Sequence, residues 1–336
     1  MLDVMAGDFG EIGTSSRLAA AQLIGGLPDH FEPQLAKLLK DNDVEVARQA
    51  MRSFGNLRKQ SLIPIVIECL EDPLLREGAL DALAVFENSI LDTLRGYLDD
   101  SALRIEIRRR IPEVLLRIGT PQASRALADN VLQADSVLRF RIISALNKLQ
   151  ELHKHPPLDR GLVETVMVAE IMGHYRSYQI LGALKNQVEE LLRESMDREV
   201  ERIFRLMKLL FPSIDFQNAY RGIQSRNQAI HANALEFLEN TLNPSLRTLL
   251  LPVIDSEVSV AERIRHADTF LNTRVSAHDA AISALVHSED PWLKSCAVYA
   301  AGKLRLKTFD AELERLARDR DPLLQKRLAE ARAMLE

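Results

Sequence analysis

The 336-residue sequence predicts an all-α protein, an α-solenoid of about eleven two-helix repeats wound into a curved superhelix. Three observations lead to this fold class. Apolar residues make up 46% of the chain and aromatic residues only 5%, and the abundant Leu, Ala, Arg and Glu favour helices over strands. Similar segments recur about every 31 residues. Inside each segment, the apolar residues follow the spacing of one helix face.

The repeat is visible when the segments are aligned on their second helix. Segments that begin at residues 16, 46, 75, 107 and 138 are separated by 30, 29, 32 and 31 residues. Further copies begin at Ile230, Leu293 and Leu324, with weaker ones near Val168, Val200 and Glu262. One pair of helices of this size buries too little apolar surface to offset the entropy lost on ordering. Such units are therefore stable only when they stack on their neighbours.

A short polar turn precedes the second helix of each repeat, and its Asp residue is predicted to cap that helix. The Asp stands three residues before the first apolar residue in five segments, at Asp43, Asp72, Asp135, Asp290 and Asp321. A Pro follows at the first helical position in three of them, at Pro73, Pro291 and Pro322. An Asp side chain in this place accepts hydrogen bonds from the unpaired N–H groups of the first turn.

A basic residue recurs just inside the second helix, at Arg76, Arg108, Arg139, Arg263 and Lys294. Two-helix units of about 31 residues with this Asp and this Arg resemble HEAT repeats of the short bacterial type. The resemblance covers most of the chain and speaks for the fold rather than for a function. It implies that Arg76, Arg108 and Arg139 form a structural ladder with Asp residues of neighbouring repeats, such as Asp72, Asp100 and Asp135.

We expect one solenoid over residues 1–336, with regular repeats at 1–152 and 226–336 and an irregular middle with longer helices at 153–225. The stretch "HKHPPLDRG" at 153–161 is typical of a break. Residues 162–184, 187–211 and 219–255 resemble the cytosolic HEAT region of bacterial proteins that carry an ATP/ADP-translocase-like transporter. In those relatives a membrane domain precedes the repeats. The resemblance therefore implies a membrane transporter domain as a partner, in another chain or in another part of this one.

The densest basic stretch of the chain spans residues 104–123. The ladder does not explain five basic residues in and after it, namely Arg109, Arg110, Arg117, Arg141 and Lys148. They fall on second helices, which usually line the concave surface of a solenoid, and there they would form one basic strip. A solvated helix face is the simpler interpretation. The alternative is a docking surface for an acidic protein partner, a phosphate or a lipid headgroup.

No catalytic or metal-binding motif stands out, so we expect no enzyme activity, metal or cofactor. His153, His155, Glu170 and His174 are the nearest approach to a ligand set, and no pattern makes three or four of them converge. The chain has no His-Glu dipeptide, which argues against the iron-dependent HEAT-repeat hydroxylases. A ligand-handling or lyase-type enzyme that uses the concave groove, similar to bilin lyases or HEAT-like DNA glycosylases, remains the alternative. Trp292 is expected to pack between repeats rather than to stack on a ligand.

The formal net charge of −5 argues against a dedicated nucleic-acid-binding protein, and we expect weak, salt-sensitive binding at most. Cys69 and Cys296 lie in apolar helical patterns, which is typical of buried thiols in a reducing compartment. No apolar run approaches the roughly 18 residues of a membrane span. These observations favour a cytoplasmic protein-interaction or regulatory scaffold without enzyme activity, including one held at the cytoplasmic face of a membrane by its partner.

Overall fold

The computed structural model describes residues 13–27, 31–100, 102–133, 135–153, 158–184, 189–275, 277–288, 290–318 and 322–335. These residues form helices and turns without any strand, which confirms the prediction of an all-α fold. Contacts divide the chain into two compact units, Met1–Leu132 with Arg141–Pro156, and Gln133–Phe140 with Pro157–Glu336. Asp321, His155 and the centre of the predicted break lie outside the described residues.

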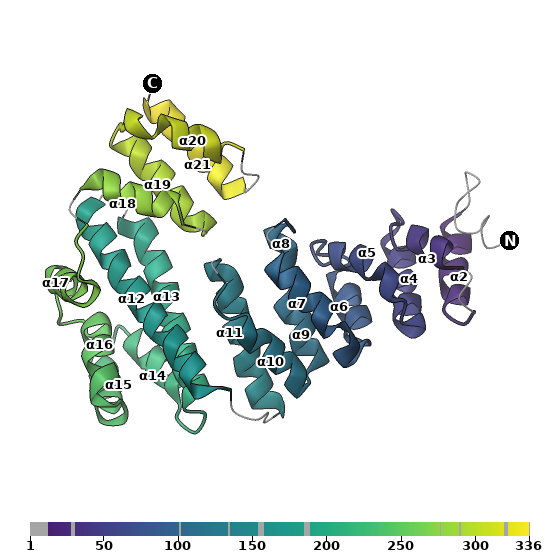
Figure 1. Ribbon diagram of the computed structural model, residues 1–336, viewed down its shortest axis with the longest axis horizontal. Coiled ribbons are helices and arrows are strands. Elements are labelled where there is room, and N and C mark those ends of the chain that lie inside the picture. The colour runs from purple at the N-terminus through teal and green to yellow at the C-terminus, as the bar shows by residue number, and fades with distance from the viewer. Residues whose placement is uncertain are drawn as a thin grey trace. The chain divides into compact units, whose positions relative to one another are not determined.

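The helices of the first unit are short and follow one another closely (Figure 1). Their bounds are α2 Thr14–Ile24, α3 Glu32–Leu38, α4 Val44–Leu57, α5 Ile63–Glu68, α6 Arg76–Ala84, α7 Leu91–Asp99, α8 Ile105–Arg108, α9 Ile111–Ile118, α10 Pro121–Asp129 and α11 Ser136–His153. The first five residues of α11 belong to the second unit. Two 3₁₀ turns, Gln60–Leu62 and Glu87–Ile90, lead into α5 and α7.

The first unit is built of two layers of helices. The helices α2, α4, α6 and α9 pack side by side in chain order, and α3, α5, α7 and α10 lie against them as the partners of the pairs. Buried apolar residues lie between neighbouring helices; the ring of Phe54 in α4, for example, lies 5.1 Å between centroids from that of Phe86, which follows α6. Successive helix pairs that stack in this way confirm the predicted α-solenoid, and the arrangement fits HEAT-like repeats.

The second unit contains the longest helices of the described chain. Its helices are α12 Arg160–Leu184, α13 Glu189–Leu210, α14 Phe216–Ile223, α15 Gln228–Thr241, α16 Pro244–Ile254, α17 Val260–Leu271, α18 His278–Val286, α19 Pro291–Lys303, α20 Asp310–Leu316 and α21 Pro322–Leu335. A 3₁₀ turn, Lys307–Phe309, precedes α20. None of the described helices is both long and apolar enough to cross a bilayer.

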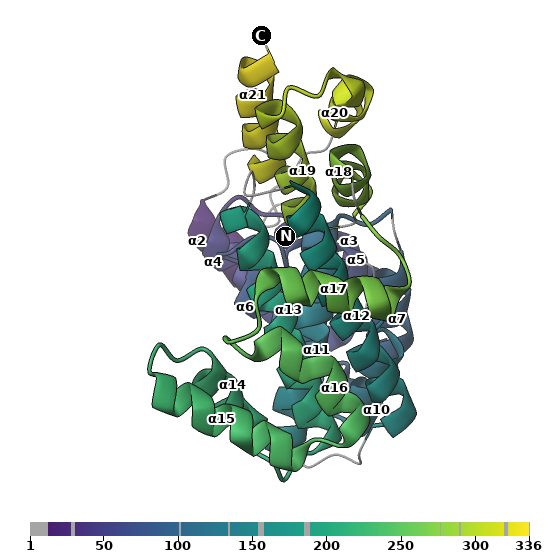
Figure 2. The same cartoon turned by 90° about the vertical axis from the view of Figure 1, so that its left-hand side faces the viewer.

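The pair α12/α13 is the centre of the second unit. Besides its own partner, α12 contacts α16, α17 and α18, and α13 contacts α14 and α19 (Figures 1 and 2). In a regular solenoid each repeat contacts only its neighbours, so α12 departs from the pattern by contacting two later helix pairs, α16/α17 and α18/α19. After α2, the described chain forms nine helix pairs, against about eleven predicted, because α12 and α13 alone extend over residues 160–210.

The Asp residues of the polar turns bind backbone N–H groups at or near the start of the second helices. Asp43 caps α4 by accepting hydrogen bonds from the N–H groups of Glu45 and Val46 at 2.9 and 3.3 Å. Asp290 likewise caps α19, and Asp135 accepts from the N–H of Leu138 at the start of α11. Asp72 differs, because it accepts from Leu74 in the turn before α6 and is not itself the cap of that helix.

The recurrent Arg donates to the end of the preceding helix. Arg76 binds the carbonyl oxygens of Leu70 and Glu71 at 2.9 and 3.0 Å, just after α5. Arg108 binds the carbonyl of Leu98 in α7 through Nε and Nη2, at 3.1 and 2.7 Å. A cation is favoured there because the last carbonyls of a helix are unpaired and carry partial negative charge. These contacts lie within one pair, and the ladder to an Asp of the neighbouring repeat stays a prediction.

Arg76→Met should therefore lower the stability of the protein although it removes no buried apolar group. Two charge-assisted hydrogen bonds are lost, and each is worth about 1.5–3 kcal/mol when a charged group takes part. We expect a loss of about 3 kcal/mol, the lower end of the sum, in the free energy of unfolding, measured by urea denaturation. The matched control is Arg52→Met, whose exposed guanidinium binds only Gln49 of its own helix. Equal stability of the two variants would show that capping by Arg does not hold the pairs together.

Candidate functional site

Three of the five predicted surface cations come together in the first unit. Arg109 and Arg110 lie between α8 and α9, and Arg141 lies in α11. Glu113 accepts from Arg110 at 2.8 Å and also from Arg141. Burial lowers the pKa of Arg141, and the charges of Arg110 and Arg109 lower it further against the opposing effect of Glu113. We call Arg109, Arg110 and Arg141 the basic cluster; Arg110 and Arg141 share the carboxylate of Glu113.

The other two predicted cations have different surroundings. Arg117 bridges α9 to α6, because it donates to Glu77 at 2.8 Å and to Asp81. Burial works to lower the pKa of Arg117, and the hydrogen bonds to Asp81 and Glu77 outweigh it and raise the pKa. The charge of Arg117 is thus balanced by two carboxylates. Lys148 is exposed on α11, seven residues and so about two helical turns after Arg141.

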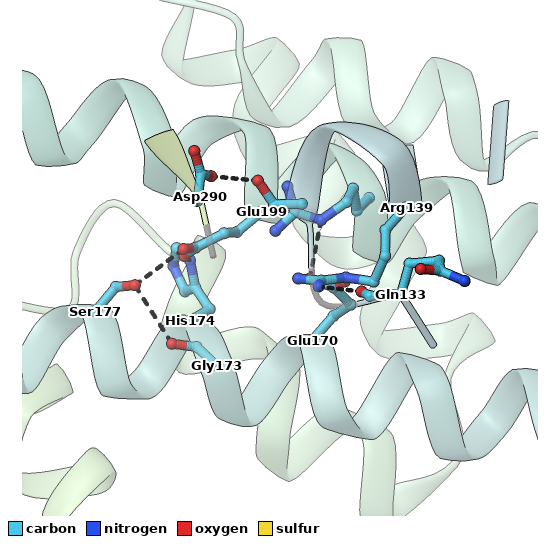
Figure 3. A network of polar contacts seen from close by, with 10 residues as sticks. Gln133, Arg139, Glu170, Gly173, His174, Ser177, Glu199 and Asp290 are labelled. Carbon is cyan, nitrogen blue, oxygen red and sulfur yellow. Dashed lines mark hydrogen bonds and ion pairs between the residues drawn. The ribbon is translucent and has the colours of Figure 1, made fainter. Parts of the chain in front are cut away.

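A buried ionic network lies in the second unit, where the first turn of α11 meets α12 and α13 (Figure 3). Glu170 of α12 accepts from Nε of Arg139 at 2.8 Å and from Nε of Arg202 at 2.9 Å. The side chains of Glu170 and Arg202 are each only 6% exposed. Arg139 also donates to the carbonyl of Gln133 at 2.6 Å. A buried carboxylate is tolerated only when it is paired, and here each of its oxygens has a cationic partner.

The same pair of helices buries a second polar group one turn further along α12 (Figure 3). Nδ1 of His174 lies 2.8 Å from one oxygen of Glu199 in α13, and the hydroxyl of Ser177 donates to the other oxygen at 2.9 Å. His174 is 2% exposed and Glu199 is 7% exposed. An ionised carboxylate only accepts hydrogen bonds, so Nδ1 carries the donated proton. Nε2 of His174 has no hydrogen-bond partner among the described residues.

The network continues to the start of α19. The hydroxyl of Ser136 donates to Asp290, which also caps α19 through the N–H of Trp292 at 2.9 Å. Both Ser136 and Asp290 are buried. The first turn of α11 is therefore tied by side chains to α12 and α19, and through Glu170 to α13 of the second unit.

A cleft of about 750 Å³ opens beside His174. Its buried floor consists of His174, Tyr178, Met196, Val200, Ile223, Val253 and Ile254. Its rim is exposed and carries charges of both signs, at Arg193, Asp197, Arg226 and Glu257. These residues come from the pairs α12/α13, α14/α15 and α16/α17, which meet around the cleft. A volume of this size is typical of a small-molecule site.

Arg263 of α17 fixes one wall of the cleft. It donates to the hydroxyl of Tyr178 at 2.8 Å and to the carbonyls of Pro252 and Asp255 at 2.9 and 2.5 Å. This is again the recurrent Arg at the end of a preceding helix, here α16. Burial raises the pKa of Tyr178, against the opposing charge of Arg263, so its hydroxyl stays protonated at neutral pH.

The remaining candidate residues, Trp292, Cys69 and Cys296, lie in surroundings that favour packing over chemistry. Trp292 is half-buried against the apolar core of the second unit, and the guanidinium of Arg198 lies 5.4 Å from its ring centroid. Burial raises the pKa of the Cys69 thiol to about 11 and that of Cys296 to about 12, so neither is a nucleophile at neutral pH. No group of three or more His, Cys, Asp or Glu side chains in the described residues is placed to hold a metal ion.

Neither the buried polar contact around Glu170 nor the one between His174 and Glu199 was predicted from the sequence. Glu170 and His174 were considered there only as metal ligands. The missed signal is spacing: Arg139, Glu170 and Arg202 follow one another at 31 and 32 residues and fall on the successive helices α11, α12 and α13. Charged residues at matching places on successive helices can meet when those helices pack side by side. The cleft has no such signal, because its lining comes from three separate helix pairs.

Comparison with known proteins does not assign the chain to a family. No family model matches the chain, and no curated protein matches it. The chain is similar to part of a homology model of the full-length AP-3 complex in an intermediate open conformation, with 14% identity and a TM-score of 0.34, over 96% of this chain and 55% of that one. It is also similar to human deoxyhypusine hydroxylase in complex with glycerol, with 14% identity and a TM-score of 0.26, over 99% and 95% of the two chains. The chain thus spans only 55% of the AP-3 chain, and neither likeness is close enough to say what it does.

Glu170→Gln should destabilise the second unit strongly. The substitution keeps the shape of the side chain but leaves Arg139 and Arg202 without their carboxylate in a buried place. Loss of one partner of a buried ion pair costs about 3–5 kcal/mol, and we expect about 3 kcal/mol in chemical denaturation. The control is Glu164→Gln on the same helix, which breaks an exposed pair with Arg160 and should change stability by less than about 0.5 kcal/mol. The interpretation fails if Glu170→Gln is as stable as the control.

Proposed function

We propose that the chain is a non-enzymatic protein-interaction module, and that its basic cluster docks an acidic segment of a partner protein. The observation that carries this proposal is the charge balance around Glu113. One carboxylate faces Arg110 and Arg141, and Arg109 adds a third cation close enough to affect the pKa of Arg141. The local excess of positive charge stands out in a chain whose net charge is −5.

A protein partner with several carboxylates would complement this surface. Additional acidic groups would reduce the repulsion among the three guanidinium groups, which adds to burial in lowering the pKa of Arg141. Lys148 lies on α11 two turns beyond Arg141 and would extend the same surface. Arg117 is left out of the docking surface, because Glu77 and Asp81 already balance its charge.

The finer proposal is that the partner is a transporter-like membrane domain, with the helical repeats on its cytoplasmic side. The resemblance of residues 162–184, 187–211 and 219–255 to transporter-linked HEAT regions supports it. An acidic loop of such a domain would be the segment that meets the basic cluster. In this proposal the repeats position or regulate the partner and perform no chemistry of their own.

A labelled decaglutamate peptide should bind the full chain at low salt, and Arg109→Ala/Arg110→Ala should weaken this binding about tenfold. Each surface charge contributes up to about 1 kcal/mol, so two together give roughly that factor. Fluorescence anisotropy measures the dissociation constant, and rising salt should weaken binding of the wild type. Melting temperatures of the two proteins should agree within a few degrees, since the substituted side chains contribute little to the core.

The matched control removes the same charge elsewhere. Arg315→Ala/Arg318→Ala takes two exposed arginines from and just after α20 of the second unit. Its affinity for decaglutamate should equal that of the wild type. If both double variants lose affinity equally, the peptide responds only to net charge, and the basic cluster is not a docking surface.

A further inference from the structure

The cleft of the second unit contains an acceptor that the fold leaves unused. Nδ1 of His174 is committed to Glu199, so in the neutral imidazole Nε2 is an acceptor. It is buried at the floor of the cleft and has no partner in the described chain. An unpaired buried acceptor costs about 1–3 kcal/mol, and most such groups in proteins are paired. A donor that arrives through the cleft, with a small shift of the flexible Met196 beside it, would recover that energy.

A second acceptor lies at the same corner of the cleft. Asp197 is close enough to His174 for the two groups to interact electrostatically, and no hydrogen bond or ion pair joins its carboxylate to another described side chain. Burial of part of the carboxylate raises the pKa of Asp197, and the nearby Arg193 opposes this only in part. A neutral imidazole nitrogen and a carboxylate together suit a protonated amine, which carries three N–H donors and a positive charge.

The rim of the same cleft offers an unpaired cation. Arg226 is exposed in the turn between α14 and α15 and has no hydrogen bond or ion pair to another described side chain. Glu257 lies on the loop between α16 and α17 and also lines the cleft. The lining therefore carries charges of both signs and no excess of either. A ligand with only an anion or only a cation would leave one side of the rim unmatched.

The floor between these groups is apolar. Met196, Val200, Ile223, Val253 and Ile254 are all buried and line the cleft. The volume of about 750 Å³ exceeds that of a single amino acid and suits a ligand of two or three residues. An apolar side chain would cover this floor, with polar groups reaching outward to the rim.

We propose that the cleft binds a short zwitterionic peptide, with its ammonium group at His174 and Asp197, its carboxylate at Arg226 and an apolar side chain on the floor. This site lies entirely in the second unit and is independent of the basic cluster. It adds a small-ligand site to the proposed function as an interaction module. The occupant is defined by its two terminal charges and its apolar body.

The dipeptide leucyl-leucine is the probe, and calorimetric titration of the full chain at low salt measures its binding. Two capped forms test each end separately: N-acetyl-leucyl-leucine lacks the ammonium, and leucyl-leucine amide lacks the carboxylate. Each cap should weaken binding about fivefold, the factor that corresponds to one partly exposed charge contact. No heat of binding at dipeptide concentrations up to about 10 mM, or equal affinity for all three forms, would overturn the proposal.

Two variants assign the ends of the peptide. Asp197→Asn should abolish the preference for the free amine and keep the preference for the free carboxylate, and Arg226→Gln should do the reverse. Both residues are exposed, so neither change should prevent folding. The matched controls are Glu236→Gln and Arg221→Gln, exposed residues of α15 and α14 that do not line the cleft. Variants that leave both preferences intact would contradict the assignment.

An NMR signal tests the role of His174 in binding without a substitution of this residue. In the ¹⁵N spectrum, the resonance of Nε2 of His174 should shift when leucyl-leucine is added. N-acetyl-leucyl-leucine should shift it less, because it brings no ammonium to the acceptor. A resonance that does not move at saturating dipeptide would remove His174 from the site.

Discussion

The carboxylate of Glu170 is the contact on which the second unit depends. It is buried, and it is held from opposite sides by Arg139 at the start of α11 and Arg202 of α13. A charge in such a place has no solvation from water, so the three side chains must stay together for the fold to persist. The pair α12/α13 is thereby fixed in register, and the first turn of α11 is fixed against both helices.

This constraint also sets the geometry of the cleft. Glu170, His174 and Tyr178 follow one another at intervals of four residues and so lie on one face of α12. Once Glu170 is held, His174 is directed towards Glu199 and Tyr178 towards Arg263. The floor of the cleft is thus a consequence of how the long helices are locked, and the exposed rim adds charges without affecting the core.

The same contact between an Arg side chain and the end of the preceding helix recurs in both units, and it explains why Arg is found just inside the second helix. Arg76, Arg108 and Arg263 each bind carbonyl oxygens at the end of the preceding helix. A guanidinium is suited to this role because it stays charged and has several donors in one plane. The contact joins the two helices of a pair, whereas burial of apolar faces joins one pair to the next.

The sequence predicted the class of fold well, because helical periodicity and the polar turns are local signals. Asp43 and Asp290 cap their helices where the pattern placed them, and the repeat spacing indicated stacked pairs. The partner of Arg76 was not predictable in the same way, because a backbone carbonyl leaves no mark in the sequence. Arg117 was predicted to belong to the basic strip, because the sequence does not show that Glu77 and Asp81, one repeat away on α6, balance its charge.

The cleft was beyond prediction for a related reason. His174 and Arg226 are separated by about fifty residues of irregular repeats, and only the packing of α12/α13, α14/α15 and α16/α17 brings their helices around one space. A solenoid with strictly regular repeats would not have placed α17 against α12. The longer helices of the second unit are what allow this contact, since α12 reaches past its neighbouring pair.

A double-mutant cycle between Arg202 and Glu170 tests the central claim most directly. Unfolding free energies of Arg202→Met, Glu170→Gln and the double variant give the coupling between the two side chains. If the buried carboxylate holds the two long helices together, the coupling should be at least about 2 kcal/mol, because Arg202→Met removes one of the two guanidinium groups that Glu170→Gln leaves without a carboxylate. Single effects that simply add, with a coupling near zero, would show that the ion pair between Glu170 and Arg202 does not hold α12 to α13 and would contradict the account.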